Sequence, residues 1–295
     1  MNVSPRLRFL SLLLTLPLSL SPLLPSASGA EDADDFSIEE IVEDVDLDAV
    51  VYGDVAWDFP VALEDLTPEY VILANKHYLL DSSFVCEPLV TMKKRKADKD
   101  GANTNGGVLK ASNSEMKLNE VCAQALVDMC EAARAYDDSY LLYLKSAYRS
   151  YQTQKTMYYN RLERNKGRDD GWVAKPGSSD HQTGLGCDVV PRSWRDKSMN
   201  GKMGAEPECI WMAAHCHEFG FILRYPSDKE EITEINYEPW HFRYVGIPAA
   251  TYIMENGLCL EEFVLQLQDA IASFLAAGGD PALVEPFIQT PAEET

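Results

Sequence analysis

Three short segments of this sequence contain the side chains that a hydrolytic metal centre requires. His181 is followed seven residues later by Asp188, which offers one imidazole nitrogen and one carboxylate oxygen as ligands. His241 offers a second imidazole, and Glu238, three residues earlier, is near enough in sequence to reach a metal-bound water. Arg149 follows a predicted strand and offers a guanidinium to the same cleft. Two His and one carboxylate suit zinc.

Such a ligand set leaves a fourth zinc position open for water, which distinguishes a catalytic zinc site from a structural one. Zinc lowers the pKa of bound water to about 7. A carboxylate outside the coordination sphere can take the proton and later deliver it to a leaving amine. A guanidinium can stabilise an oxyanion or bind a substrate carboxylate through two hydrogen bonds. Taken singly, each of these residues is more often structural than catalytic.

The elements that must position these residues are predicted from periodicity and capping signals. We expect strands at 71–73, 141–144, 185–190 and 240–245. We expect helices at 118–133, at 151–162 with Ser150 as N-cap, at 207–219 ended by Gly220, and at 260–277. Because helices and strands do not alternate regularly, the fold class predicted is α+β, with a small antiparallel sheet flanked by helices. Gly184 and Gly186 should allow a tight turn between His181 and Asp188.

The first thirty residues have the order of a secretory signal peptide. Arg6 and Arg8 precede an apolar stretch from Phe9 to Leu24, and small residues follow at 28–30. We therefore expect export to the cell envelope or the extracellular space, with an uncleaved N-terminal anchor as the alternative. No other segment is long and apolar enough to cross a bilayer, so no membrane insertion is expected after cleavage.

The rest of the chain is predicted to contain one folded domain. Residues 31–65 begin with a strongly acidic run and are expected to be a flexible spacer. Residues 66–265 form the predicted domain, and residues 266–295 the end of the C-terminal helix and a tail. Residues 93–107 are polar and rich in Gly and Asn, which indicates an exposed loop.

Charge and cysteine content narrow the class of protein further. The formal net charge of −21 argues against nucleic acid as a partner, because phosphate neutralisation needs clustered Lys and Arg. An anionic substrate would need local positive charge at the site. The seven Cys are an odd number, so at least one thiol stays unpaired within the chain. Export allows one or two disulfides, and the sequence does not say which.

Three blocks of sequence resemble the motifs of VanY-type D-alanyl-D-alanine carboxypeptidases, which are zinc peptidases of the Hedgehog/DD-peptidase fold. These blocks read SAYRSYQTQ at 146–154, KPGSSDHQTGLGCDVV at 175–190 and YEPWHFRYVG at 237–246. GFILRYPSDKEEIT at 220–233 and ANKHYLLD at 74–81 are also similar. The resemblance extends from about Tyr70 to Phe263, with the blocks in the expected order.

The resemblance implies a Zn²⁺ cofactor and removal of the C-terminal D-alanine from peptidoglycan stem peptides. The zinc ligands implied are His181, Asp188 and His241. The catalytic residues implied are Glu238, as general base and acid, and Arg149, which stabilises the oxyanion or holds the substrate. The substrate-binding residues implied are Ser146, Gln154 and Ser179.

Two other functions stay open at this point. One is L,D-carboxypeptidase activity on tetrapeptides, which needs the same metal centre. The other is a non-catalytic cell-wall binding module that keeps the fold.

The chain also departs from the family pattern. Asp180 stands where Glu is commoner, with little expected consequence for ligation, and His215 and Cys216 replace the usual Asn and small residue. His215 and His217 are two apart on a predicted helix, so they point to different faces and are expected to be structural.

Overall fold

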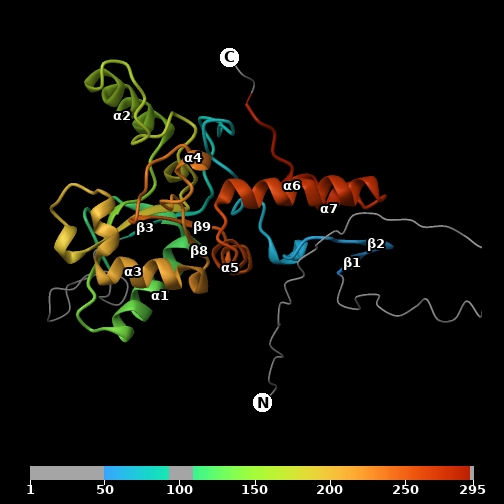
Figure 1. Cartoon of the computed structure of the whole chain (residues 1–295), viewed down its shortest axis with the longest axis horizontal. Helices are drawn as coiled ribbons and strands as arrows, with labels where there is room; N and C mark the ends of the chain where they lie inside the picture. The colour runs from blue at the N-terminus through green and yellow to red at the C-terminus, as the bar shows by residue number, and fades with distance from the viewer. Residues whose placement is uncertain (1–49, 93–108, 293–295) are drawn as a thin grey trace, which may run out of the picture. The chain divides into compact units, whose positions relative to one another are not determined.

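A five-stranded mixed sheet forms the centre of the computed structural model, which describes residues 50–92 and 109–292 (Figure 1). Its strands are β4 (Leu109–Ala111), β6 (Leu142–Ser146), β7 (Gly186–Pro191), β8 (Phe221–Leu223) and β9 (His241–Tyr244). They lie in the order β4-β6-β7-β9-β8. The predicted α+β class is confirmed. The prediction that the sheet is antiparallel is wrong at one edge, where β4 runs parallel to β6.

The register of the three central strands brings the predicted site residues together. Asp188 on β7 lies opposite Ser146 on β6 and opposite His241 on β9. Residues directly opposite each other on paired strands have side chains on the same face, so they become neighbours. Hydrogen bonding between strands thus joins segments that are more than forty residues apart in sequence.

Helices cover the sheet and extend beyond it. They are α1 (Glu120–Tyr136), α2 (Tyr151–Arg164), α3 (Pro207–His215), α4 (Glu230–Thr233), α5 (Ile247–Glu255), α6 (Leu260–Ala276) and α7 (Pro281–Val284). In Figure 1, α1 and α3 lie on one side of the sheet and α2 stands on the other. Apolar residues of α1, α3 and the sheet share one buried cluster. Asn119 caps α1 and Ser150 caps α2, as predicted for the latter.

The predicted spacer ends too late in the sequence. Residues 50–65 contain the short strands β1 (Val51–Tyr52) and β2 (Val55–Ala56) and belong to the folded unit. Trp57 and Leu63 are buried in a second apolar cluster that also contains Phe274 of α6. The burial of aromatic and aliphatic side chains stabilises this segment in the fold, and this effect outweighs the tendency of its acidic residues to stay in water. The position 265 lies within α6, in agreement with the helix predicted at 260–277, whose end was assigned to residues 266–295.

The strand predicted at 71–73 does not form, although Val71 and Leu73 are buried. Side chains, and not a neighbouring strand, form the hydrogen bonds with the backbone groups of this segment. Arg243 donates to the carbonyl oxygens of Tyr70 and Ile72, at 3.0 and 2.9 Å. Gln289 accepts from the amide of Leu73 and donates to the carbonyl of Val71. Buried backbone groups need partners, and side chains supply them here.

The other predicted elements differ from the structure in detail. The helix predicted at 207–219 becomes a 3₁₀ turn after His215, and Gly220 ends it at φ +81°. A small antiparallel pair, β3 (Leu89–Thr91) and β5 (Lys117–Asn119), lies outside the central sheet. The loop predicted at 93–107, like the signal peptide, lies outside the described residues. Among the described residues no helix has the length and apolarity needed to cross a bilayer.

All seven Cys are buried free thiols, so the described residues contain no disulfide. Their side chains pack as small apolar groups.

Candidate metal centre and its cleft

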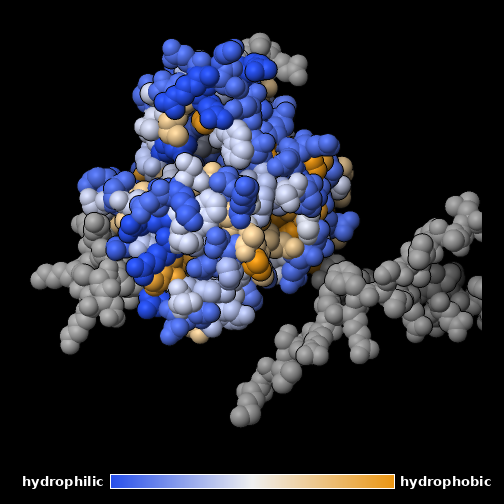
Figure 2. All heavy atoms as spheres, turned by 60° about the vertical axis from the view of Figure 1, so that its left-hand side comes forward, coloured by the Kyte–Doolittle hydropathy of each residue, from blue (hydrophilic) through white to orange (hydrophobic). Residues whose placement is uncertain are grey.

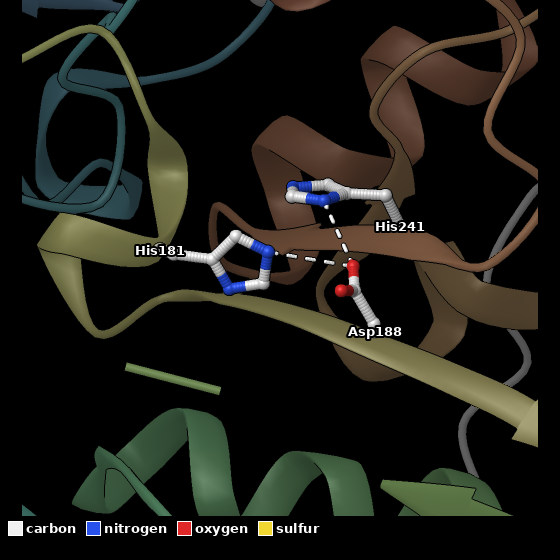
Figure 3. A group of neighbouring side chains, drawn as sticks. All are labelled: His181, Asp188 and His241. Atoms are coloured by element: carbon white, nitrogen blue, oxygen red, sulfur yellow. Dashed lines mark hydrogen bonds and ion pairs between the residues drawn. The ribbon is translucent and has the colours of Figure 1, made fainter. Parts of the chain in front are cut away.

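His181, Asp188 and His241 point toward one another (Figure 3). All three line a surface cleft. One nitrogen or oxygen atom from each residue lies within 4.8 Å of the others. Nδ1 of His241 lies 3.1 Å from Oδ1 of Asp188, and Nε2 of His181 lies 3.4 Å from the same oxygen. All three side chains are buried. The convergence predicted from sequence is confirmed as geometry, and two imidazoles with one carboxylate fit a zinc ion.

The ring of His181 is held in one orientation by the backbone of Ala147, the residue that follows β6. Its Nδ1 lies 2.8 Å from the carbonyl oxygen of Ala147. A carbonyl oxygen only accepts, so Nδ1 carries the proton, and Nε2 is the nitrogen of the neutral ring that is left for a metal. Burial lowers the pKa of His181, and the charge of Arg149 lowers it further. Both effects favour the neutral imidazole that binds metals.

Asp188 carries the negative charge of the ligand set. Burial alone would raise the pKa of Asp188, but the two histidines outweigh burial and hold that pKa well below its usual range. The carboxylate is therefore ionised at neutral pH, as a metal ligand must be.

Two glycines shape the segment between His181 and Asp188, each for its own reason. Gly184 ends the short 3₁₀ helix Asp180–Thr183 at φ +79°, a left-handed conformation that favours glycine. Gly186 has no such requirement. A Cβ there would lie 2.9 Å from the backbone carbon of Asp180, so Gly186 permits a close approach of two backbone segments. The tight turn predicted for this segment is present at Gly184.

Glu238 lies beside the ligand set and lines the cleft. Its Oε2 is 3.7 Å from Nδ1 of His241, and its side chain is 12% exposed. Burial raises the pKa of Glu238 well above its usual value, and repulsion from Asp188 raises it further, while Arg149 opposes both. A buried carboxyl with a raised pKa next to a metal site is suited to accept and release a proton.

Arg149 also lines the cleft, and two neighbouring side chains hold its guanidinium. Its guanidinium donates to Oε1 of Gln154 at 2.6 Å and to Oγ of Ser146 at 3.2 Å. Its backbone amide donates to the carbonyl of His181 at 3.0 Å. Burial lowers the pKa of Arg149, and the charges of Asp188 and Glu238 oppose that effect.

The cleft has a volume of about 230 Å³ and a mixed lining. Gln154 and Ser179 line it as predicted, whereas Ser146 does not and reaches it only through Arg149. One wall is apolar, with Trp172 stacked on Trp240 at an interplanar angle of 13°. Besides these two rings, the apolar lining residues are Met157, Val173, Ala174, Met199 and Ile235.

Sequence reasoning missed a buried ion cluster behind the ligands. Asp180 is fully buried and accepts hydrogen bonds from Arg224, at 2.8 Å, and from Arg243. Its Oδ2 lies 3.9 Å from Nε2 of His241. A signal for this cluster was present, since Arg243 lies two residues after His241 on one strand and thus shares its face.

The other histidines lie away from the ligand set. His215 stacks on Trp211 and pairs with Glu218 at 2.7 Å, which agrees with the predicted structural role. His77 is largely exposed and lies 3.2 Å from Glu234. Among the described residues, His181, Asp188 and His241 are the one group found with metal-binding spacing.

The fold and cleft define an α+β protein with a candidate metal centre of the hydrolytic kind. Residues 115–247 match the family model described as VanY, D-alanyl-D-alanine carboxypeptidase. The chain is also 36% identical to the bifunctional D-Ala-D-Ala dipeptidase and D-Ala-D-Ala carboxypeptidase VanXYC of Enterococcus gallinarum, over 44% of this chain and 70% of that protein. The chain belongs to the VanY family of D-alanyl-D-alanine carboxypeptidases.

Solved structures of similar proteins have the same fold. The LdcB LD-carboxypeptidase is 35% identical, with a TM-score of 0.56 over 66% of this chain and 86% of that one. A variant of the D,D-pentapeptidase VanY in complex with Zn(II) is 31% identical, with a TM-score of 0.50 over 66% and 99%. The chain spans about half the length of two other curated relatives, 53% and 52%.

Proposed function

We propose that this protein is a zinc-dependent carboxypeptidase that removes the C-terminal D-alanine from peptides ending in D-alanyl-D-alanine. The observation that carries the proposal is the convergence of His181, Asp188 and His241 beneath a cleft lined by Glu238 and Arg149. These are the groups that hydrolysis of a peptide with a free carboxylate end requires. Family membership supports the reaction class and the substrate.

Zinc is proposed as the metal on two grounds. The donor set of two imidazoles and one carboxylate is one that zinc prefers, and VanY has been solved in complex with Zn(II). When bound, zinc supplies Lewis-acid chemistry, lowering the pKa of water to about 7 and polarising a carbonyl. His181 would bind through Nε2, because its Nδ1 is committed to Ala147.

Glu238 is proposed as the group that moves the proton. Hydrolysis adds water across the C–N bond, so one proton must leave the attacking water and another must reach the leaving amine. Glu238 lies at the ligand set and has a raised pKa, which makes it effective in both transfers. Its backbone is fixed by hydrogen bonds to Tyr225 and His241, so the carboxyl is aimed at the cleft.

Arg149 is proposed to bind the terminal carboxylate of the substrate. Among the described lining residues it is the one Arg or Lys, and Gln154 and Ser146 hold its guanidinium in place. The formal net charge of −21 opposes an anionic substrate, so local positive charge must overcome the overall field.

On the face of the molecule shown in Figure 2, hydrophilic residues predominate and hydrophobic residues occur in small groups.

A second candidate is L,D-carboxypeptidase activity on tetrapeptides. The structural similarity to LdcB, an LD-carboxypeptidase, favours it. Both reactions use the same ligands and the same carboxylate-binding Arg. They differ in the residue that precedes the terminal D-alanine, which the apolar wall formed by Trp172 and its neighbours would contact.

The test combines metal analysis with product analysis. Purified protein loaded with one zinc is incubated in parallel with a pentapeptide ending in D-alanyl-D-alanine and with the corresponding tetrapeptide. Release of D-alanine from the pentapeptide supports the proposal, and release from the tetrapeptide alone supports the second candidate. Release from neither, by protein that holds zinc, would overturn both and leave a binding module of the same fold.

We further propose that the protein acts in the cell envelope. Residues 1–30 carry the order of a signal peptide, and the proposed substrate is a component of the cell wall. Fractionation of cells, with mass spectrometry of the mature N-terminus, tests this location.

A further inference from the structure

The buried carboxylate of Asp180 connects the two candidate histidine ligands to the rest of the fold. Asp180 immediately precedes His181, and its Oδ2 lies 3.9 Å from Nε2 of His241, a buried nitrogen without a hydrogen-bond partner among the described residues. Nδ1 of His241 faces Asp188 on the opposite side of the ring. The position of Asp180 therefore bears on the backbone of one ligand and on the ring of the other.

Two arginines hold Asp180, and neither is exposed to solvent. Arg243 donates to Oδ1, and its remaining nitrogens donate to backbone carbonyls, including those of Tyr70 and Ile72. Arg224 donates through Nε to Oδ2 at 2.8 Å. Every nitrogen of both planar guanidiniums donates at least one hydrogen bond, so a small displacement of either group breaks several contacts together.

Glu261 holds the other edge of Arg224. Its two carboxylate oxygens accept from Nη1 and Nη2 of Arg224, at 2.8 and 2.7 Å, in a bidentate pair. Glu261 lies in the first turn of α6, and its side chain is 11% exposed. The cluster of two arginines and two carboxylates is neutral overall, and removal of one carboxylate would leave a buried guanidinium unpaired.

We propose that Glu261 and Arg224 are positioning residues for the metal centre, acting through Asp180 on His181 and His241. This inference rests on the proposed function, because it requires that the three ligands bind zinc. It also makes α6 part of the site's support, although α6 lies outside the residues 115–247 that match the family model. Groups that orient metal ligands commonly affect metal affinity 10–100-fold.

A merely structural cluster would have a different signature. It would lower the stability of the fold when broken, and zinc affinity would stay the same wherever the protein remains folded. Glu262 supplies a matched control, because it is the next residue of α6 and is also ion-paired, to Lys229 at 2.9 Å. Its carboxylate caps the amide of Cys259 and has no contact with Arg224 or Asp180.

The experiment measures the zinc dissociation constant by competition with a chromophoric chelator, for full-length wild type, Glu261→Gln and Glu262→Gln. All are measured at a temperature at which near-ultraviolet circular dichroism shows each protein folded. We expect Glu261→Gln to weaken zinc binding by roughly 10–100-fold and Glu262→Gln by less than about twofold. Asp180→Asn should weaken binding as much, and the double variant Asp180→Asn/Glu261→Gln should lose less than the sum.

Three outcomes overturn the inference. If folded Glu261→Gln binds zinc as tightly as wild type does, the cluster has only a structural role. If Glu262→Gln loses as much zinc affinity as Glu261→Gln does, the effect belongs to the start of α6 and not to the cluster. If the wild-type protein binds no zinc, the proposed metal centre is wrong and the inference fails with it. In the first two outcomes wild type still binds zinc, so failure of the inference alone is distinguishable from failure of the proposed function. If Glu261→Gln does not fold, Arg224→Lys is measured, because it keeps the charge and loses the bidentate pair.

Discussion

Nδ1 of His181 lies 2.8 Å from the carbonyl oxygen of Ala147, and the amide of Arg149, two residues later, donates to the carbonyl of His181. The segment that supplies the cleft's guanidinium thus also sets the tautomer of a candidate ligand. A displacement of this segment would alter the ligand ring and the carboxylate-binding group together. The chemistry of the site therefore depends on contacts between the segment that follows β6 and the 3₁₀ turn before β7.

Replacement of Glu238 should abolish turnover and leave metal binding intact. We expect Glu238→Gln to lower kcat by roughly 10²–10⁴-fold, because it removes proton transfer and keeps the shape of the side chain. D-Alanine release and zinc content are measured on the same preparation. Loss of zinc together with activity would contradict the assigned role.

Removal of a ligand should abolish zinc-dependent stabilisation. In wild type, free zinc at a thousand times its dissociation constant should stabilise the fold by about 4 kcal/mol. Asp188→Asn should lose most of that stabilisation in a thermal unfolding assay. His215→Ala is the matched control, since His215 is partly exposed and pairs with Glu218 away from the site. An equal loss in the control would disprove the ligand assignment.

Substitution of Arg149 should weaken substrate binding, whereas substitution of an arginine outside the cleft should not. Arg149→Lys keeps the charge but loses the planar fork, so we expect KM to rise by about tenfold or more. Arg164→Lys, on the exposed end of α2, should leave KM unchanged. A peptide amidated at its C-terminus should bind poorly to wild type and show no further loss with Arg149→Lys.

The stability of the zinc-free protein should fall on acidification. The pKa values of Asp180 and Asp188 are held below their usual range, by the two arginines and by the two histidines respectively, against the opposing effect of burial. Their stabilisation is present above the unfolded pKa of about 3.9 and is lost as the pH falls through the folded values. Urea unfolding at pH 7 and pH 3, with a chelator present, measures the difference.

Glu238 should have the opposite pH dependence, which gives that experiment an internal control. Its pKa is raised, so its contribution is complete below the unfolded pKa of about 4.3 and is lost as the pH rises through the folded value. Glu238→Gln should therefore increase stability at neutral pH and leave the acid-side loss in place. If the stability of wild type does not change on acidification, the expectation for Asp180 and Asp188 is contradicted. If Glu238→Gln is no more stable than wild type at neutral pH, the expectation for Glu238 is contradicted.

The segment before residue 66 should contribute to the stability of the fold. Trp57 is 3% exposed, and its ring lies 5.7 Å from that of Phe274 in α6. We expect Trp57→Ala to lower the free energy of unfolding by about 3–5 kcal/mol. Val51→Ala, at an exposed position of the same hairpin, should have little effect. A Trp57→Ala protein as stable as wild type would restore the spacer interpretation.

The sequence alone determined which chemical groups the site contains, because ligand type depends on residue identity. His181, Asp188, His241, Glu238 and Arg149 were identified from motif spacing and family resemblance, as were the main helices and central strands from periodicity. The residues of the motif blocks, together with their order along the chain, were sufficient to predict the family.

Only the tertiary structure decided how these groups are held. The register between β6, β7 and β9 sets the distances among the ligands, and register follows from packing across the whole sheet. The link from Asp180 through Arg224 to Glu261 joins segments up to 81 residues apart, so no local pattern predicts it. Side chains of Arg243 and Gln289 likewise replaced a predicted strand at 71–73. Burial makes such long-range partners obligatory, because a charge or backbone group removed from water must be paired wherever the fold places it.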